Sequence, residues 1–231
     1  MRYLDHGNFG VVMEDDDTVL KILLESCPEE LFRNEDAVLS RLPVHPGLPR
    51  YLGKIVEPFR ALRIERARGE NLFDLIDQNR LSNREKKTIA RAIAETVAVL
   101  HEHGIVHGDL KPENIVVDRK TLGHKLIDFG GAVDAASPDT GRVDFLTGTI
   151  PYMAPEVRAG NPPTAASDVY SYGLLLFVLF YHTHPSEFDR NRLDRSTREG
   201  GIIRACTRRP SLRPSARCLL RMWDGLSCVL Q

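Results

Sequence analysis

The sequence lacks the features of two large classes of protein. Its four cysteines in 231 residues (Cys27, Cys206, Cys218 and Cys228) include no pair at CxxC spacing. Neither a zinc knuckle nor a disulfide framework is therefore indicated, and we expect free thiols in a reducing compartment. The formal net charge is only −1, which gives no reason to expect nucleic acid as the main partner.

Long apolar runs are missing as well. The longest, GLLLFVLFY after Tyr172, falls short of the roughly 20 residues that cross a bilayer, and a helix that is apolar on all sides is usually buried in protein. The first ten residues, MRYLDHGNFG, contain no apolar core of signal-peptide length. We therefore expect no membrane partner and a soluble intracellular protein, placed in the cytoplasm with the nucleus as an alternative.

The patterning predicts a small β-rich part followed by a larger helical part. β-like runs alternate with a Gly-turn and an acidic turn over residues 3–24, a helical stretch follows Pro28, and LPRYLGKIV and FRALRIER read as strands. Beyond residue 70 a capping-box pattern, Ser82 to Glu85, opens a long amphipathic helix. NIVV and HKLID predict two small strands, and helices are expected from Ser167 and around residues 202 and 215.

Two features of the β-rich part could serve phosphate binding. Gly7 and Gly10 in DHGNFGVV would let backbone amides approach phosphate oxygens, although an ordinary hairpin explains the pattern equally well. Lys21 lies in the apolar run TVLKIL. A strand lysine is usually just exposed, but its spacing after the Gly-turn would let it point back beneath that turn.

The stretch HGDLKPENIVVD carries the clearest chemical signal. Asp109 could accept or orient a hydroxyl proton, Lys111 could neutralise phosphoryl charge, and Asn114 could offer an oxygen to Mg²⁺. LIDFGG then supplies a second acid, Asp128, with Gly130 allowing a sharp exit of the chain. Each acid alone could simply cap a turn, but chance explains the whole ordered set poorly.

In this order the motifs resemble those of eukaryotic-type protein kinases of the Ser/Thr class, along nearly the whole chain. The matching stretches are DHGNFGVV, TVLK, HGDLKPEN, DFG, GTIPYMAPE and SDVYSYG. The resemblance implies an α+β bilobal fold in a single domain, with residues 1–66 as the N-lobe and 67–231 as the C-lobe. It also implies transfer of the γ-phosphoryl group of ATP, with Mg²⁺, to a Ser or Thr hydroxyl of a protein substrate.

The same resemblance implies roles for individual residues. Lys21 would hold the α- and β-phosphates with Glu35 as its helix partner, or Glu30 in its place. Asp109 would be the catalytic base and Lys111 the γ-phosphate contact, and Asn114 and Asp128 would bind Mg²⁺. The residues expected to contact the nucleotide are Gly7, Asn8, Phe9, Gly10, Val12, Val19, Lys21, Glu65, Ala67, Val116 and Asp128, with Ile64 behind the adenine. Glu156 with Arg213, and Asp168 below the catalytic turn, would be structural, and DLKPEN with Thr149 indicates Ser/Thr specificity.

The chain also departs from the family pattern. Gly108 replaces the usual Arg (a non-RD, HGD form), so we expect no switching by phosphorylation at Ser137, Thr140 or Thr147. Asp5 replaces the first loop glycine and would weaken ATP binding unless it points to water, and the first strand is expected to be nearly missing.

Further departures concern the histidines and the docking region. The polar stretch from Tyr181 to Gly201 replaces a docking helix. We expect solvated positions, not metal ligands, for the histidine pairs His182 with His184 and His101 with His103.

Two alternatives stay open. The departures at Asp5, the first strand and the docking region would suit a pseudokinase that acts as a nucleotide-binding or scaffold module. A small-molecule phosphotransferase is less favoured, because such enzymes lack an APE-ended segment followed by SDVYSYG. The sequence indicates neither the substrate nor the oligomeric state.

Overall fold

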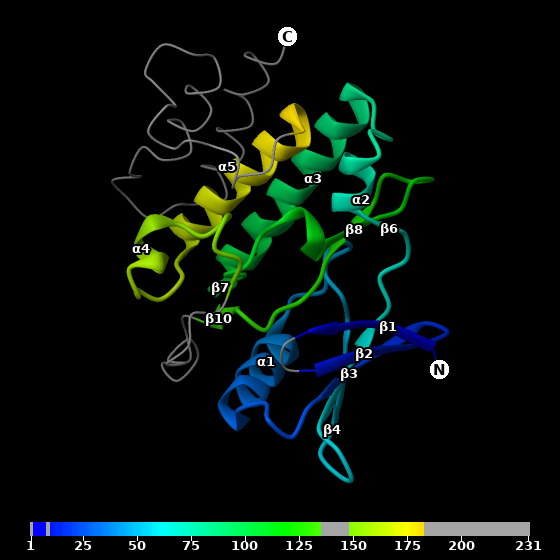
Figure 1. Cartoon of the computed structure of the whole chain (residues 1–231), viewed down its shortest axis with the longest axis vertical. Coiled ribbons are helices and arrows are strands. Elements are labelled where there is room, and N and C mark those ends of the chain that lie inside the picture. The colour runs from blue at the N-terminus through cyan, green and yellow to red at the C-terminus, as the bar shows by residue number, and fades with distance from the viewer. Residues whose placement is uncertain (1, 8–9, 135–147, 183–231) are drawn as a thin grey trace.

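The computed structural model describes residues 2–7, 10–134 and 148–182, and for residues 5–7 it describes the backbone only. Within these ranges the chain forms a sheet with one helix and a separate, mainly helical part, joined by a connecting segment at residues 65–70 (Figure 1). The expected α+β class is therefore confirmed. The helices predicted around residues 202 and 215 lie outside the described residues, as do Asn8, Phe9, Ser137, Thr140, Thr147, His184 and Arg213.

The N-terminal part is built on a five-stranded antiparallel sheet in the order β1-β2-β3-β5-β4. Its strands are β1 (Arg2–Gly7), β2 (Gly10–Asp15), β3 (Thr18–Leu23), β4 (Tyr51–Ile55) and β5 (Ala61–Glu65). The expectation of a nearly missing first strand is wrong. Pairing along β2, from Arg2 opposite Glu14 to Gly7 opposite Gly10, supplies hydrogen-bond partners for a full six-residue strand.

One helix, α1 (Glu29–Arg41), covers this sheet. It starts directly after Pro28, whose fixed φ suits a helix start. Two glutamates in its first turn stabilise the helix, because their negative charges lie near the positive end of the helix dipole. Its inner side buries Leu31, Phe32, Asn34, Glu35, Val38 and Leu39. Because Asn34 and Glu35 lie on that side, the helix brings polar groups, as well as apolar ones, to the interior.

The C-terminal part is organised by two long helices, α3 (Asn83–Glu102) and α5 (Ala165–Tyr181), with the short helices α2 (Leu72–Asp77) and α4 (Pro155–Arg158) beside them (Figure 1). The predicted capping box at Ser82 is present, and Thr164 and Ser167 form a second one at the start of α5. The buried face of α3 contains Ile89, Ile93, Val97 and Leu100, as the spacing predicted. No helix among the described residues is long and apolar enough to span a membrane.

Short strands position the segments between these helices. β8 (Ile115–Val117) lies between β6 (Glu70–Asn71) and β9 (His124–Leu126), and β7 (Ile105–Val106) pairs with β10 (Val133–Asp134). A 3-10 turn, η1 (Pro112–Asn114), leads into β8. The turn with Asp109 therefore follows β7 in one small sheet, and the turn with Asp128 follows β9 in the other.

Candidate active site

Lys21 is the centre of a charge cluster that joins the two parts of the chain. Its Nζ lies 2.7 and 2.8 Å from the two carboxylate oxygens of Glu35 and 2.9 Å from Oδ1 of Asp128. Glu35 is the residue of α1 that reaches Lys21, whereas Glu30 is exposed at the other side of the helix start. The cluster ties β3, α1 and the turn after β9 together.

The charges in this cluster shift one another's titration. Burial disfavours the ammonium of Lys21, but the carboxylates of Asp128 and Glu35 outweigh it and raise the pKa of Lys21 above its usual range. The Lys21 charge is the largest influence on Asp128 and holds the pKa of that carboxyl well below its usual range. Asp128 is therefore an anion that is still 48 % exposed and able to bind a cation.

The strand register explains why Lys21 reaches this cluster. Lys21 is opposite Val12 on β2 and Leu62 on β5, and Val19 lies two residues earlier on the same face. Val12 and Val19 are half-buried, so this face offers two apolar side chains next to the lysine. Val116 is half-buried on β8 between two fully buried neighbours, and it therefore points away from the core.

Glycine is required where β2 begins. A Cβ at Gly10 would lie 2.6 Å from the carbonyl oxygen of Ile22 on the paired strand, which is closer than side-chain carbons approach backbone oxygens. Gly7 is opposite Gly10 at the end of the β1–β2 pair, and Asp5 is opposite Val12. The predicted Gly-turn is thus a hairpin with its glycines at the tip.

Asp109 lies at the centre of a second cluster, in the turn after β7. Its Oδ1 accepts a hydrogen bond of 2.8 Å from the N–H of Thr149, and its Oδ2 accepts one of 3.0 Å from Nδ2 of Asn114. Nζ of Lys111 lies 3.1 Å from Oδ2 of Asp109 and 2.5 Å from the hydroxyl oxygen of Thr149. The structure therefore brings together the acid, the cation and the amide that the sequence singled out.

Asp168 holds this turn from below, as expected. Its Oδ2 accepts from the N–H of His107 at 2.8 Å and its Oδ1 from the N–H of Gly108 at 2.9 Å. Burial acts to raise the pKa of Asp168, but hydrogen bonds from His101 and from the backbone outweigh it and lower that pKa. The turn that carries Asp109 is thus fixed to α5 by a buried anion.

The expectation of a solvated His101 is wrong. Its side chain is only 4 % exposed, and Nε2 lies 2.8 Å from Oδ2 of Asp168. No role was expected for His107 from the sequence, yet this residue is fully buried, and its ring centroid lies 4.9 Å from that of Phe129. His103, at the end of α3, and His182, directly after α5, are exposed, as expected.

Gly108 occupies a position that admits no side chain. Its φ is +78°, and a Cβ there would lie 2.1 Å from the carbonyl oxygen of Gly131. The left-handed backbone and this contact together explain why glycine stands here. The backbone of the catalytic turn packs directly against the segment that follows Asp128.

Hydrogen bonds to neighbouring segments hold the connecting segment in place. The N–H of Glu65 donates to the carbonyl of Arg50 and that of Arg66 to the carbonyl of Asp17, at 2.8 and 2.9 Å. Glu65 also accepts from Nζ of Lys125 on β9 at 3.2 Å. Ala67, the other predicted adenine contact in this segment, is half-buried.

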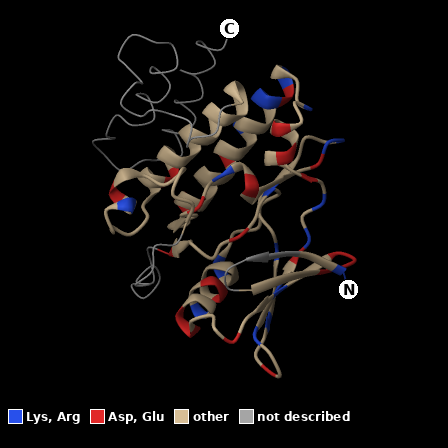
Figure 2. Cartoon of the chain, in the orientation of Figure 1, with Lys and Arg blue, Asp and Glu red and all other residues tan. Residues whose placement is uncertain are grey.

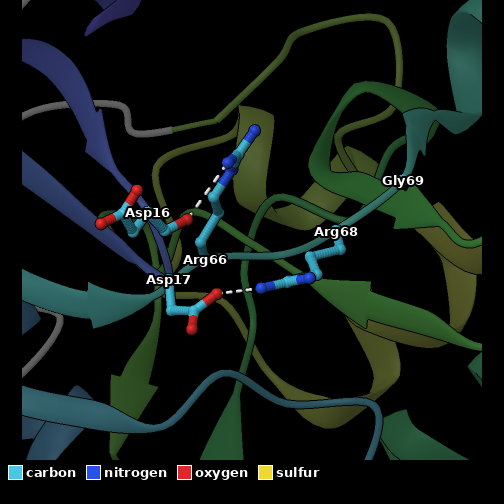
Figure 3. A pocket seen from close by; sticks show the side chains of 5 residues that line it. All are labelled: Asp16, Asp17, Arg66, Arg68 and Gly69. Carbon is cyan, nitrogen blue, oxygen red and sulfur yellow. Dashed lines mark hydrogen bonds and ion pairs between the residues drawn. The ribbon is translucent and has the colours of Figure 1, made fainter. Parts of the chain in front are cut away.

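An open hollow of about 590 Å³ lies beside this segment (Figure 3). Arg66 donates to the carbonyl of Asp16, and Arg68 is paired with the Asp17 carboxylate. The side chains that line this hollow include none of those expected to bind nucleotide, and none from the Lys21 or Asp109 cluster. Charged residues of both signs are interspersed over the described part of the molecule (Figure 2).

The residues present fit a nucleotide-bound magnesium ion. Asn114 uses its Nδ2 in both of its hydrogen bonds to Asp109, so its amide oxygen is the atom suited to a metal, together with the Asp128 carboxylate. Among the described residues there is no group of three or more His, Cys, Asp or Glu side chains that could hold a metal alone. Mg²⁺ commonly takes one or two protein ligands and completes its shell with phosphates and water.

Comparison with known proteins agrees with this geometry. The sequence profile of the protein kinase domain matches residues 9–221, so the chain belongs to the protein kinase family. It is 32 % identical to the serine/threonine-protein kinase PkaA of Streptomyces coelicolor over 92 % of this chain and 43 % of that protein. It is 33 % identical to the RAF proto-oncogene serine/threonine-protein kinase of Xenopus laevis, over 85 % of this chain and 33 % of that one.

A third relative is calcium-dependent protein kinase 32 of Arabidopsis thaliana, 32 % identical over 80 % of this chain and 36 % of that protein. The chain thus spans less than half of the length of each of these three curated relatives. The fold is the bilobal protein kinase fold, with the sheet and α1 as the smaller lobe.

Proposed function

We propose that this chain is a serine/threonine protein kinase that transfers the γ-phosphoryl group of ATP, with Mg²⁺, to a hydroxyl of a protein substrate. The observation that carries the proposal is the arrangement around Lys21, whose ammonium pairs at once with Glu35 of the smaller lobe and Asp128 of the larger one. The names of the relatives support Ser/Thr specificity. A cytoplasmic location is part of the proposal.

In the proposed site Lys21 binds the α- and β-phosphates, and Glu35 holds the lysine in place for them. The amide oxygen of Asn114 and the carboxylate of Asp128 would hold Mg²⁺, which would neutralise phosphate charge. Val12 and Val19 cover the adenine from one side and Val116 from the other, and its edge meets the backbone of Glu65 and Ala67. Gly7 and Gly10, opposite each other at the ends of β1 and β2, supply backbone amides to the phosphates.

Asp109 is the proposed base. The substrate hydroxyl gives its proton to the Asp109 carboxylate as its oxygen forms a bond to the γ-phosphorus, and the bond to the β-phosphate oxygen breaks so that ADP leaves. The N–H of Thr149 and the amide of Asn114 orient the carboxylate. Lys111, within 3.1 Å of Asp109, stabilises charge on the transferring group.

The proposal is tested by transfer of labelled γ-phosphate from MgATP to mixed Ser/Thr peptides, with Tyr peptides in parallel. Asp109→Asn keeps the shape of the side chain and removes the base, so we expect transfer to fall by about 10²- to 10⁴-fold. Asp77→Asn, at an exposed position at the end of α2, is the matched control and should leave transfer unchanged.

Three results would contradict the proposal in different ways. Transfer to Tyr peptides alone would overturn the Ser/Thr assignment. Equal transfer by the native chain and Asp109→Asn would remove Asp109 from its role. No transfer by the native chain, while MgATP still raises the melting temperature, would favour a nucleotide-binding pseudokinase.

A further inference from the structure

Helix α1 is tied to the start of the segment that follows Asp128 by three successive contacts. The N–H of Phe129 donates to the carboxylate of Glu35. Nδ2 of Asn34 donates to the carbonyl of Ala132 at 2.9 Å, in a buried position. Arg41, at the last turn of α1, forms an ion pair with Asp134. Asn34 and Arg41 are seven residues apart, about two helical turns, so they lie on the same side of α1, and Glu35 is next to Asn34.

The acidic partner in the last contact is buried. The Asp134 side chain is 1 % exposed and that of Arg41 is 46 % exposed. Asp134 lies on β10, which pairs with β7 through Asp134 opposite Ile105. β7 leads directly into the turn with Asp109. A buried carboxylate needs a positive partner, and among the described residues Arg41 supplies one from the other lobe.

Residue 108, directly before Asp109, cannot be a phosphate-binding arginine, because any Cβ there would clash with the backbone of Gly131. The backbone at Gly108 is in direct contact with Gly131, three residues before Asp134. The segment is therefore held between the catalytic turn on one side and α1 on the other, by groups that the chain itself provides.

We propose that Asp134 is the built-in anion that holds α1, through Arg41, in the position where Glu35 pairs with Lys21, so that this arrangement forms without phosphorylation. Arg41 and Asp134 are positioning residues and touch neither nucleotide nor substrate. The kinetic part of this inference rests on the proposed kinase function, whereas the placement of α1 does not.

The test compares the phosphatase-treated native chain with Arg41→Gln, Asp134→Asn and the double variant. Arg33→Ala is the matched control, because Arg33 lies on the same helix in an exposed pair with Glu29. The first readout is hydrogen exchange of the α1 amides (residues 29–41), which needs no catalytic turnover. We expect faster α1 exchange in both single variants, no further increase in the double variant, and native exchange in Arg33→Ala.

The second readout is kinetic. We expect Arg41→Gln and Asp134→Asn each to lower kcat by about five- to tenfold, with the double variant no lower than either. KM for ATP should change less than kcat does, because this pair does not hold Val12, Val19 or the connecting segment, although Lys21 loses part of its support from Glu35. Arg41→Lys, which keeps the charge, should restore part of kcat.

Several outcomes would overturn the inference. Native α1 exchange in Arg41→Gln would do so alone, and this half-exposed variant decides the matter if Asp134→Asn fails to fold. Additive losses of kcat would show that the two residues act independently. A phosphorylated native chain with slower α1 exchange and higher kcat would show that a phosphate is needed after all. If the native chain transfers no phosphate, the exchange measurements still decide the role of Asp134.

Discussion

At the scale of single residues, close approach of backbone sets the geometry of the site. Gly108 combines a left-handed φ of +78° with direct contact to Gly131. The N–H groups of His107 and Gly108 then both reach the carboxylate of Asp168. Any side chain at residue 108 would push the catalytic turn away from its anchor, and Asp109 is the next residue.

Gly108→Ala should therefore lower both stability and phosphoryl transfer. We expect a loss of about 2 kcal/mol or more in the free energy of unfolding, from strain at positive φ plus the clash with Gly131. Denaturant unfolding measures it. Gly160→Ala separates the two causes, because Gly160 also has positive φ, +91°, but no atom lies within 4 Å of its added Cβ. Equal losses in the two variants would show that the contact with Gly131 is unimportant.

The residues of the site differed in how far sequence predicted them. Lys21, Asp109, Asn114 and Asp128 stand in ordered motifs, so their approach to one another could be anticipated. His101 could not be placed, because a histidine at a helix end has the same local pattern whether it is solvated or buried. Only the packing of α5 against α3 brings Asp168 to it. His107 is likewise buried by long-range packing against Phe129.

At the scale of elements, the sequence predicted where a helix begins when the groups that stabilise its end lie within a few residues of it. The capping box of α3 is such a case: the N–H of Glu85 donates to Oγ of Ser82 at 3.3 Å, and Oε2 of Glu85 accepts from the N–H of Ser82 at 2.8 Å. Strand β1 was misjudged because its length depends on pairing with β2, which the local sequence does not contain.

Ser82→Ala should destabilise the protein by about 1 kcal/mol, because it leaves an N–H at the start of α3 without its acceptor. Thr88→Ala is the matched control on the same helix, since Thr88 is exposed and its hydroxyl donates only to the carbonyl four residues before it. Thermal and denaturant unfolding measure both variants. Equal effects at the two positions would mean that the cap contributes nothing beyond loss of a hydroxyl.

At the scale of the whole molecule, one strand links helices, sheet and connecting segment. On β9, His124 lies within 3.0 Å of the hydroxyl of Thr96 on α3, in a buried contact. Its neighbour Lys125 donates to the carbonyl of Leu48 at 3.0 Å and to Glu65 at 3.2 Å. β9 also leads to Asp128, so the same strand joins both lobes and presents an acid of the site.

Because His124 is buried, its titration should make global stability depend on pH. Burial, with smaller effects from His45 and Lys125, lowers the pKa of His124 to about 4 from an ordinary 6.5. The unfolded chain then binds a proton at this residue that the folded chain does not, so stability is unaffected above about pH 6.5 and falls as the pH drops toward 4. Across this window the loss is about 3 kcal/mol.

His124→Gln should remove most of that fall, because glutamine cannot take up a proton. The measurement is the free energy of unfolding between pH 8 and 4 for both proteins, with the difference at pH 8 as the baseline for the changed packing. We expect the curves to converge or cross as the pH falls, since only the native chain loses stability through this residue. Below about pH 4 both should fall together, because Asp128 and Asp168 then take up protons in the unfolded chain, whereas their lowered pKa values keep them ionised in the folded chain. Parallel curves from pH 8 to 4 would show that His124 is not the buried base that joins β9 to α3.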